Sequence, residues 1–463
     1  MREPGEILLV ACYELGHQPL AVAWPAAFLE RAGYRPATLD VSVEALDAEA
    51  IRRARLIAIA VPMHTALRLG VAVAERARAL NPGCHLCFVG LYASLNAEYL
   101  FTRGADSVIG GEIEGALVDL ARALESGADG PLPFVHRPGQ PAEPCRSKLD
   151  FPVPSRSRLP ALARYAQLVT ASGPKPVGYV EASRGCLHLC QHCPIPPVYG
   201  GRFVAVPADV VLADVRQQVA AGAQHVTFGD PDFLNGPTHA LRIARALHAE
   251  FPRVTFDFTA KIEHLLRHRD RLPELASLGC LFVVSAAEST SDVVLANLDK
   301  GHTRADIAEA LRAVRGAGID LRPTWVAFTP WTAMEDYADL LDFIEREDLI
   351  DHVDPVQYSL RLLVPPGSLL LRSEAMRPHL RELEPEALAY RWVHPDPRVD
   401  RLQEVVAAAI VQAAERDPDP AIVFDRVRTL ADEANGSTRH ALVAAILPAG
   451  RPRPAHLSEP WFC

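Results

Sequence analysis

The stretch VGYVEASRGCLHLCQHC (177–193) joins a β-rich run to a loop that holds three cysteines within eight positions. The run 177–183 predicts a strand, and the loop carries Cys186, Cys190 and Cys193. Thiolates at this short spacing are ligands for an iron–sulfur cluster, zinc or copper(I). Because the active sites of βα barrels lie on loops at the carboxyl ends of the strands, the stretch predicts a metal centre at the mouth of a barrel.

Three thiolates leave one ligand position to explain. If they hold three irons of a [4Fe–4S] cube, the fourth iron keeps an open position for a substrate or a cofactor. A zinc site with His188 or His192 as the fourth ligand is the alternative, but closed zinc sites usually pair two ligand couplets far apart in the sequence. Three unliganded buried thiols are a further possibility. The spacing favours the cluster.

Strand and helix patterns alternate after this loop up to about residue 370. Apolar β-rich runs predict strands, and segments such as 208–222 and 305–318 predict intervening helices. Six such units are enough for an open, partial (βα)6 barrel, short of a closed eight. After 177–183, the predicted strands are 225–230, 254–260, 281–288, 321–328 and 356–363.

The N-terminal part of the chain shows the same alternation, which predicts a parallel, doubly wound, Rossmann-like sheet and an α/β fold class. Sheets of this kind bind ligands beyond the carboxyl ends of their strands. That edge is predicted at 14–19, 62–65, 90–94 and 110–112. The expected regions are this domain at 1–125, a Pro-rich linker at 126–178, the barrel at 179–370 and a small, mainly helical region at 371–463.

The motif CLHLCQHC has the C-x3-C-x2-C form of radical S-adenosylmethionine (SAM) enzymes, and the chain resembles that family over about 175–370. The resemblance implies a [4Fe–4S] cluster on the three cysteines, with SAM on the open iron. It also implies an external electron donor of the flavodoxin or ferredoxin type. The implied SAM contacts are Gly229 and Asp230 after the second strand, Glu288 and Ser289 after the fourth, and His192 beside the third cysteine.

Two positions depart from the pattern of that family. The residue before the third cysteine is often aromatic and packs on adenine, whereas here it is His192. The motif after the second strand has Asp230 and Pro231 where glycine and glutamate are common. The stretch 293–303 resembles the usual continuation of the family.

The N-terminal pattern resembles the cobalamin (B12)-binding domains that precede many radical SAM cores. The segments 16–34, 90–98 and 108–117 resemble its loops and turns, and 151–165 resembles the join between the two domains. The D-x-H-x-x-G motif of classical cobalamin domains is absent, because Leu15 and Leu20 flank His17 at the Asp and Gly positions. The resemblance still implies cobalamin as a cofactor.

His64 follows the third predicted strand, at the edge where a ligand is expected. A partly buried histidine that caps a loop is the simpler interpretation of such a residue. The functional interpretation places His64 beside the cobalamin or the substrate.

The last residues read LSEPWFC (457–463) and end in Cys463. They resemble the tail of a radical SAM group, the CUAEP/CCAEP-tail (seleno)proteins, in which a second cysteine or selenocysteine, then Ala-Glu-Pro, follows. We therefore expect Cys463 to be a catalytic sulfur, with the sequence truncated at a selenocysteine codon. A frayed terminus is the plainer interpretation.

Composition and charge bear on the location of the protein, its partners and the role of its cysteines. The chain has 463 residues and a formal net charge of −10, and it shows no dense basic run, signal peptide or membrane-length apolar run. We therefore expect a cytoplasmic protein with no nucleic-acid or membrane partner. Clustered cysteines then indicate metal ligands, whereas Cys12, Cys84, Cys87 and Cys280 are expected in the core.

The favoured function is a cobalamin-associated radical SAM enzyme that moves a methyl or another SAM-derived group to a small molecule. Radical rearrangement, or formation of a carbon–heteroatom bond that could involve a metalloid, is the enzymatic alternative without cobalamin. A non-catalytic protein that senses cobalamin or a metal is the alternative of another class.

Overall fold

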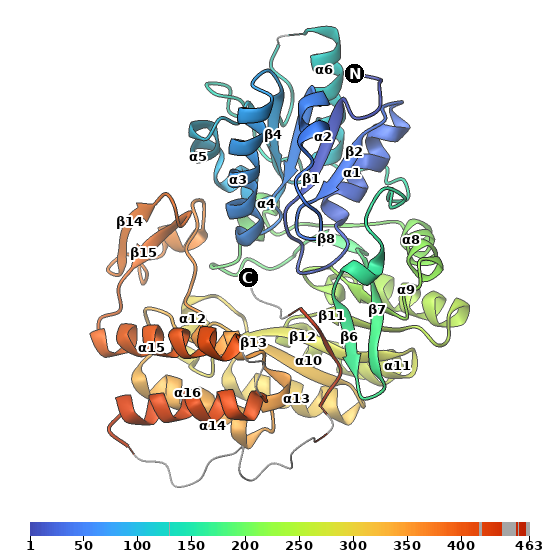
Figure 1. Cartoon of the computed structure of the whole chain (residues 1–463). Coiled ribbons are helices and arrows are strands. Elements are labelled where there is room, and N and C mark those ends of the chain that lie inside the picture. Colours follow the sequence, from blue (N-terminus) through green and yellow to red (C-terminus); the bar gives the residue numbers. More distant parts are fainter. Residues whose placement is uncertain (129, 416–418, 438–450, 452, 460–463) are drawn as a thin grey trace.

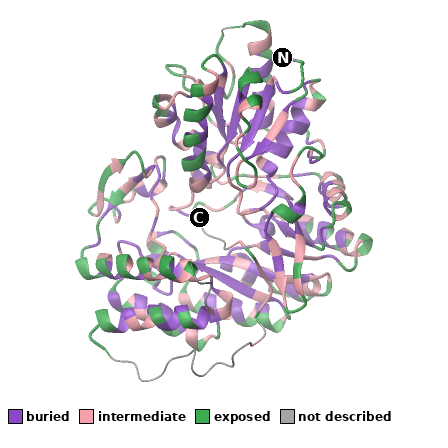
Figure 2. Cartoon of the chain, in the orientation of Figure 1, coloured by how far each residue is buried: buried purple, intermediate pink, exposed green. Residues whose placement is uncertain are grey.

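The computed structural model describes residues 1–128, 130–415, 419–437, 451 and 453–459. Two α/β units follow one another along the chain, and a helical layer with a small hairpin lies beside the second (Figure 1). Buried residues concentrate in the two sheets and on the helix faces against them (Figure 2). No described helix is long and apolar enough to cross a lipid bilayer. The cytoplasmic location and the four region boundaries stay predictions.

The N-terminal sheet has five parallel strands in the order β2-β1-β3-β4-β5. Alternate residues of β1 face two different cores, one shared with α1 and α6 and the other with α2 and α3. The doubly wound prediction is confirmed. The elements are β1 (Ile7–Ala11), α1 (Leu20–Arg31), β2 (Ala37–Asp40), α2 (Ala48–Arg53), β3 (Leu56–Ala60), α3 (His64–Leu80), β4 (His85–Val89), α4 (Leu91–Leu95), α5 (Ala97–Thr102), β5 (Ser107–Ile109) and α6 (Ile113–Ser126).

The second sheet has seven strands in the order β13-β12-β11-β10-β7-β6-β16. Its parallel strands are β7 (Gly173–Val180), β10 (His225–Phe228), β11 (Thr255–Thr259), β12 (Cys280–Glu288) and β13 (Asp320–Trp325). This is the expected partial barrel. Its helices are α8 (Ala208–Ala220), α9 (Pro237–Glu250), α10 (Ile262–Arg267), α11 (Leu272–Ser277), α12 (Asp292–Asn297), α13 (Arg304–Gly316) and α14 (Met334–Arg346).

The predicted sixth strand, 356–363, was wrong in detail. The chain forms a 3-10 helix there, η5 (Pro355–Ser359), and Arg361 makes a single bridge to Phe328. Pro355 has no N–H to give to a ladder, which favours a turn at this position. The sixth unit of the barrel is therefore a 3-10 helix followed by a single bridge to Phe328, and not a strand.

The C-terminal region contains strands that the sequence pattern did not indicate. A hairpin of β14 (Leu380–Glu384) and β15 (Ala389–Trp392) precedes α15 (Pro397–Ala414) and α16 (Pro420–Ala434). The tail then returns as β16 (His456–Leu457), antiparallel to β6 (Gln167–Thr170). Strands of two to five residues carry too little periodicity to be recognised in a sequence.

The tail also touches the N-terminal unit. The hydroxyl of Tyr13 donates a hydrogen bond to Glu459, with 2.5 Å between the oxygens. Tyr13 belongs to the loop after β1, so the described end of the tail lies beside the predicted ligand edge. Cys463, the expected catalytic sulfur, lies outside the described residues.

Arg156 ties the two units together from the linker. Its guanidinium is buried and makes a bidentate ion pair with Asp214 of α8 at 2.6 and 2.7 Å. It also donates to the side-chain oxygen of Gln18 at 2.9 Å and to the carbonyl of Tyr179 at 2.6 Å. The loop after β1 is thereby held against the first barrel strand.

Candidate functional site

The three clustered cysteines lie where the sequence placed them, on the loop between β8 (Ser183–Gly185) and α7 (Ile195–Tyr199) at the carboxyl end of β7. Gly185 has a φ of +73°, and a Cβ there would lie 2.4 Å from the carbonyl oxygen of Arg202. Only glycine fits this turn. The loop therefore begins with a fixed bend.

The thiols of this loop would have to lose their protons to act as metal ligands. Cys190 is buried, whereas Cys186 and Cys193 are half-buried. Burial raises the pKa of Cys186, and it raises that of Cys193 to about 12. Such thiols are protonated at neutral pH, and a coordinating metal would be required to hold them as thiolates.

A compact group of metal-binding donor atoms lies beside this loop. Among the described residues, the group of three metal-binding donor atoms within 4.8 Å of one another is His188, Asp232 and His264, and it contains no cysteine. The assignment of the three thiols to a cluster therefore rests on their spacing in the sequence.

Glu288 closes the site from the end of β12. Its backbone has a φ of +66°, and its side chain is 6% exposed. His192 Nε2 and Lys300 Nζ each lie 3.1 Å from the same oxygen, Oε1. Burial raises the pKa of Glu288, but Lys300 and then His192 outweigh it, so the pKa lies well below its ordinary value. The structure thus brings together two predicted SAM contacts and adds Lys300.

Lys300 was not singled out from the sequence, although it lies in the stretch 293–303 that resembles the family. Its side chain is 3% exposed, and it interacts electrostatically with Cys190 and Cys193. A buried ammonium beside thiolates lowers the cost of their negative charge. In the sequence, Lys300 is the one lysine of a mixed stretch that also holds Asn297, Asp299 and His302.

Asp230 is hydrogen-bonded to the two residues 182 and 183, just before the cluster loop. Its Oδ2 accepts a hydrogen bond from the amide of Ala182 at 2.9 Å, and its Oδ1 accepts one from the Ser183 hydroxyl at 2.5 Å. Ser289, the fourth predicted contact of this group, accepts the amide of Ser291 at 3.1 Å. Asp230 therefore has two partners within the chain at the place where a SAM contact was expected.

Burial raises the pKa of Asp230 to about 7, although its hydrogen bonds act in the opposite direction. A carboxyl with a raised pKa binds its proton more tightly in the folded state. The stability it contributes is therefore present below the ordinary pKa and is lost as the pH rises. We expect the free energy of unfolding to fall between about pH 4 and 7, by at most about 1.4 kcal/mol per pH unit. Chemical denaturation of Asp230→Asn should show a flatter profile across this window; identical profiles would contradict the assignment.

Gly229 lies against the ring of Tyr179. A Cβ at Gly229 would be 2.3 Å from the Tyr179 hydroxyl, and that ring is itself stacked on His17 at 4.4 Å and 6°. No side chain fits between them.

We expect Gly229→Ala to lower the free energy of unfolding by about 1–3 kcal/mol, because the buried Tyr179 ring cannot move aside without disturbing His17. Gly236→Ala is the matched control, since its nearest neighbour would be 3.5 Å away. Equal unfolding midpoints for the two variants would show that the Tyr179 contact is not tight.

The carboxyl edge of the N-terminal sheet faces this loop. Arg184, two residues before Cys186, pairs with Glu114 at 2.7 Å, with Glu181 at 3.0 Å and with Glu112 at 3.3 Å. Glu112 and Glu114 follow β5. The residues that precede the cluster are thus bonded to the predicted ligand edge of the first unit.

That edge has the form expected for a ligand site. In sheets with the order 2-1-3-4-5, ligands bind where the strand order reverses, at the carboxyl ends of β1 and β3. The loop after β1 carries Tyr13 and Glu14, and β3 leads to Met63 and His64, all of them half-buried. These residues border the position at which sheets of this strand order bind their ligands.

Two predicted residues of this edge have partners within the protein. His17 is 4% exposed and stacks on Tyr179, and burial lowers its pKa to about 4. His64 Nε2 lies 2.8 Å from the carbonyl oxygen of Ala387 in the β14–β15 hairpin. Cys12, Cys84, Cys87 and Cys280 are buried, which confirms that they belong to the core.

Two family models match the chain. Residues 180–344 match the radical SAM superfamily, and residues 7–121 match the B12 binding domain. The first family uses a [4Fe–4S] cluster and SAM, and the second binds cobalamin. The expected cluster and SAM therefore agree with the first match, and the expected cobalamin agrees with the second.

Two solved structures share this fold. The cobalamin-dependent SAM radical enzyme OxsB, with aqua-cobalamin bound, matches 93% of this chain and 72% of its own at a TM-score of 0.71 and 15% identity. The radical SAM methyltransferase TsrM from Kitasatospora setae, with cobalamin and a [4Fe–4S] cluster bound, matches 74% of this chain and 73% of its own at a TM-score of 0.61 and 18% identity. At these identities the likeness concerns the fold.

The curated relatives match a shorter part. A tRNA-2-methylthio-N(6)-dimethylallyladenosine synthase of Shewanella denitrificans is 24% identical over 226 residues, which are 45% of this chain and 46% of the relative. The chain thus spans about half the length of the curated relatives it matches. Because this relative is named for tRNA, the expected lack of a nucleic-acid partner gains no support.

Proposed function

We propose that this chain, a member of the radical SAM superfamily with an N-terminal B12-binding domain, transfers a methyl or another SAM-derived group to a small molecule. One observation carries the proposal. Arg184 joins the cluster loop to Glu112 and Glu114 at the carboxyl edge of the N-terminal sheet. A cluster on the loop and a cobalamin on that edge would therefore be neighbours.

The residues have distinct proposed roles. Cys186, Cys190 and Cys193 would hold the cluster, and the loop 14–19 with His64 would border the cobalamin. When bound, the cluster supplies the electron that cleaves SAM, and cobalamin carries a methyl group. Cys463 is proposed as a second reactive sulfur on the strength of the tail resemblance alone.

The contacts to SAM are proposed from the strand ends. Glu288 and Ser289 would meet the ribose, and His192 would lie beside the adenine. The pairing of Glu288 with Lys300 and His192 fixes its carboxylate before any ligand arrives. Gly229 and Asp230 would border the SAM amino group, with Asp230 held by Ala182 and Ser183.

Analysis of SAM products tests the proposal. Incubation of the loaded enzyme with SAM, a reductant and candidate acceptors should yield S-adenosylhomocysteine together with a methylated product. 5′-Deoxyadenosine without S-adenosylhomocysteine would favour the radical rearrangement or the carbon–heteroatom bond formation instead. The absence of any SAM turnover would favour a sensing protein and would sink the enzymatic proposal.

A further inference from the structure

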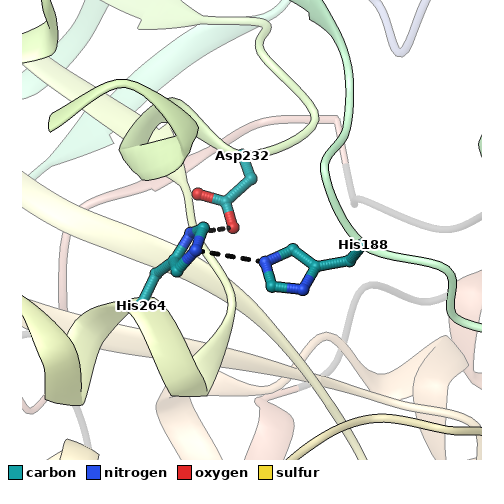
Figure 3. Close-up of side chains that lie close together, drawn as sticks. All are labelled: His188, Asp232 and His264. Atoms are coloured by element: carbon teal, nitrogen blue, oxygen red, sulfur yellow. Dashed lines mark hydrogen bonds and ion pairs between the residues drawn. The ribbon is translucent and has the colours of Figure 1, made fainter. Parts of the chain in front are cut away.

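Three polar side chains from different segments meet beside the cluster loop (Figure 3). His188 lies on the loop itself, Asp232 follows β10, and His264 lies on α10 after β11. Their donor atoms all lie within 4.8 Å of one another. None of these residues has a role in the proposed function.

The contacts within this group leave one nitrogen without a hydrogen bond. His264 Nε2 lies 3.1 Å from His188 Nε2, and these two nitrogens form a hydrogen bond. His264 Nδ1 is buried and has no hydrogen-bond partner, although Asp232 Oδ2 lies 2.8 Å away. An unbonded buried nitrogen is costly, so its position beside a carboxylate requires an explanation.

The short separation without a hydrogen bond is the spacing of two ligands on one ion. Metal bonds of about 2.0–2.2 Å place neighbouring donor atoms about 2.8–3.1 Å apart in a six-coordinate ion and about 3.3–3.6 Å apart in a tetrahedral one. The rings of His188 and His264 have centroids 4.6 Å apart and are tilted by 58°. Since an imidazole binds an ion through one nitrogen, a shared ion would replace one of the two present contacts of His264. The donor atoms of the three residues lie within 4.8 Å of one another, which is close enough for that rearrangement.

The carboxylate of Asp232 is the buried negative charge of the group. Asp232 and His264 are 0% and 3% exposed, so little water reaches the carboxylate. Asp232 also accepts the backbone amides of Leu234 at 2.9 Å and Lys261 at 3.2 Å, which fix its orientation. The nearby Glu263 is paired with Lys261 and Arg267, and one of its oxygens lies 3.7 Å from His188 Nδ1. The negative charge of Asp232 remains for a cation.

We propose that His188, Asp232 and His264 form a binding site for a divalent metal ion of the Zn²⁺ or Fe²⁺ class, separate from the cluster. Two imidazoles and one carboxylate suit these metals and not Mg²⁺ or Ca²⁺, which prefer oxygen ligands. The ion would join the cluster loop to the segments after β10 and β11. It would thereby fix the part of the loop between Cys186 and Cys190.

Zinc counting on the full-length chain tests this site without an activity assay. The protein with its cluster is given Zn²⁺, freed of loose metal by gel filtration, and analysed for zinc and iron. We expect one equivalent of zinc in the wild type, and its loss in His264→Ala and Asp232→Asn with iron retained. His268→Ala is the matched control, because its ring lies 5.9 Å from that of His264 and outside the group.

A second background separates this zinc from the thiolates. In the Cys186→Ser/Cys190→Ser/Cys193→Ser chain, with folding followed by circular dichroism, the zinc should persist and again be lost with His264→Ala. If His264→Ala and Asp232→Asn lose iron as well as zinc in the cluster-bearing protein, the same substitutions in this cysteine-free background show whether the zinc site exists on its own. Zinc absent from the wild type, retained in His264→Ala or lost with the cysteines alone would overturn the proposal.

Discussion

Cys190→Ala is expected to lose the iron–sulfur cluster and, with it, all cleavage of SAM above background. Cys190 is 6% exposed on the loop that carries all three clustered cysteines. Without one of its three thiolate ligands the cluster would not bind stably. The open iron that binds SAM would then be lost as well. The measurements are iron and sulfide content, charge-transfer absorption and formation of 5′-deoxyadenosine or S-adenosylhomocysteine.

Cys87→Ala provides the matched control for this loss. Cys87 is also buried, at 0% exposure, but it lies in β4 of the N-terminal sheet. We expect it to keep the cluster at the cost of about 1 kcal/mol of stability, as for removal of one buried small group. SAM turnover that survives in Cys190→Ala would contradict the assignment of the three cysteines.

Arg184→Met is expected to lower the free energy of unfolding by about 3–5 kcal/mol. The Arg184 side chain is 12% exposed and neutralises Glu112, Glu114 and Glu181, whose exposures are 0%, 2% and 20%. Its removal leaves buried carboxylates without a cation at the contact between the two units. Urea unfolding and retention of cobalamin on gel filtration measure the two consequences.

The pH dependence of this variant follows from Glu112. Burial raises the pKa of Glu112 to about 7, although Arg184 opposes the rise. Without Arg184 the carboxyl would bind its proton more tightly in the folded state. The defect should therefore be smallest in acid and grow as the pH rises through neutrality.

The control for Arg184 is an exposed ion pair. Arg216→Met breaks a pair with Glu250 whose side chains are 51% and 38% exposed, and we expect a cost of less than about 1 kcal/mol. Equal stability of the two variants would show that Arg184 does not hold the units together.

Local patterns predicted the fold and the metal loop. Buried parallel strands are short apolar runs that alternate with amphipathic helices, so β1, β3, β10 and β12 could be predicted from the local residue pattern. The cluster loop was equally local, because its ligands lie within eight residues of one another. Nothing beyond the neighbouring residues was needed for these predictions.

Contacts between distant segments could not be predicted in this way. Arg184 and Glu112 are 72 residues apart, and His188 and His264 are 76 residues apart. Which of many arginines and histidines meet depends on how the strands order themselves in two sheets. The strand β16 was missed for a related reason, since two residues gain their strand geometry only from pairing with β6.

Anaerobic reconstitution with iron, sulfide and hydroxocobalamin, followed by gel filtration and absorption spectra, tests the central claim most directly. We predict four irons per chain with the spectrum of a [4Fe–4S] cluster, together with one retained cobalamin. A chain that binds iron or zinc without the cluster spectrum, and from which all the cobalamin elutes freely, would contradict it.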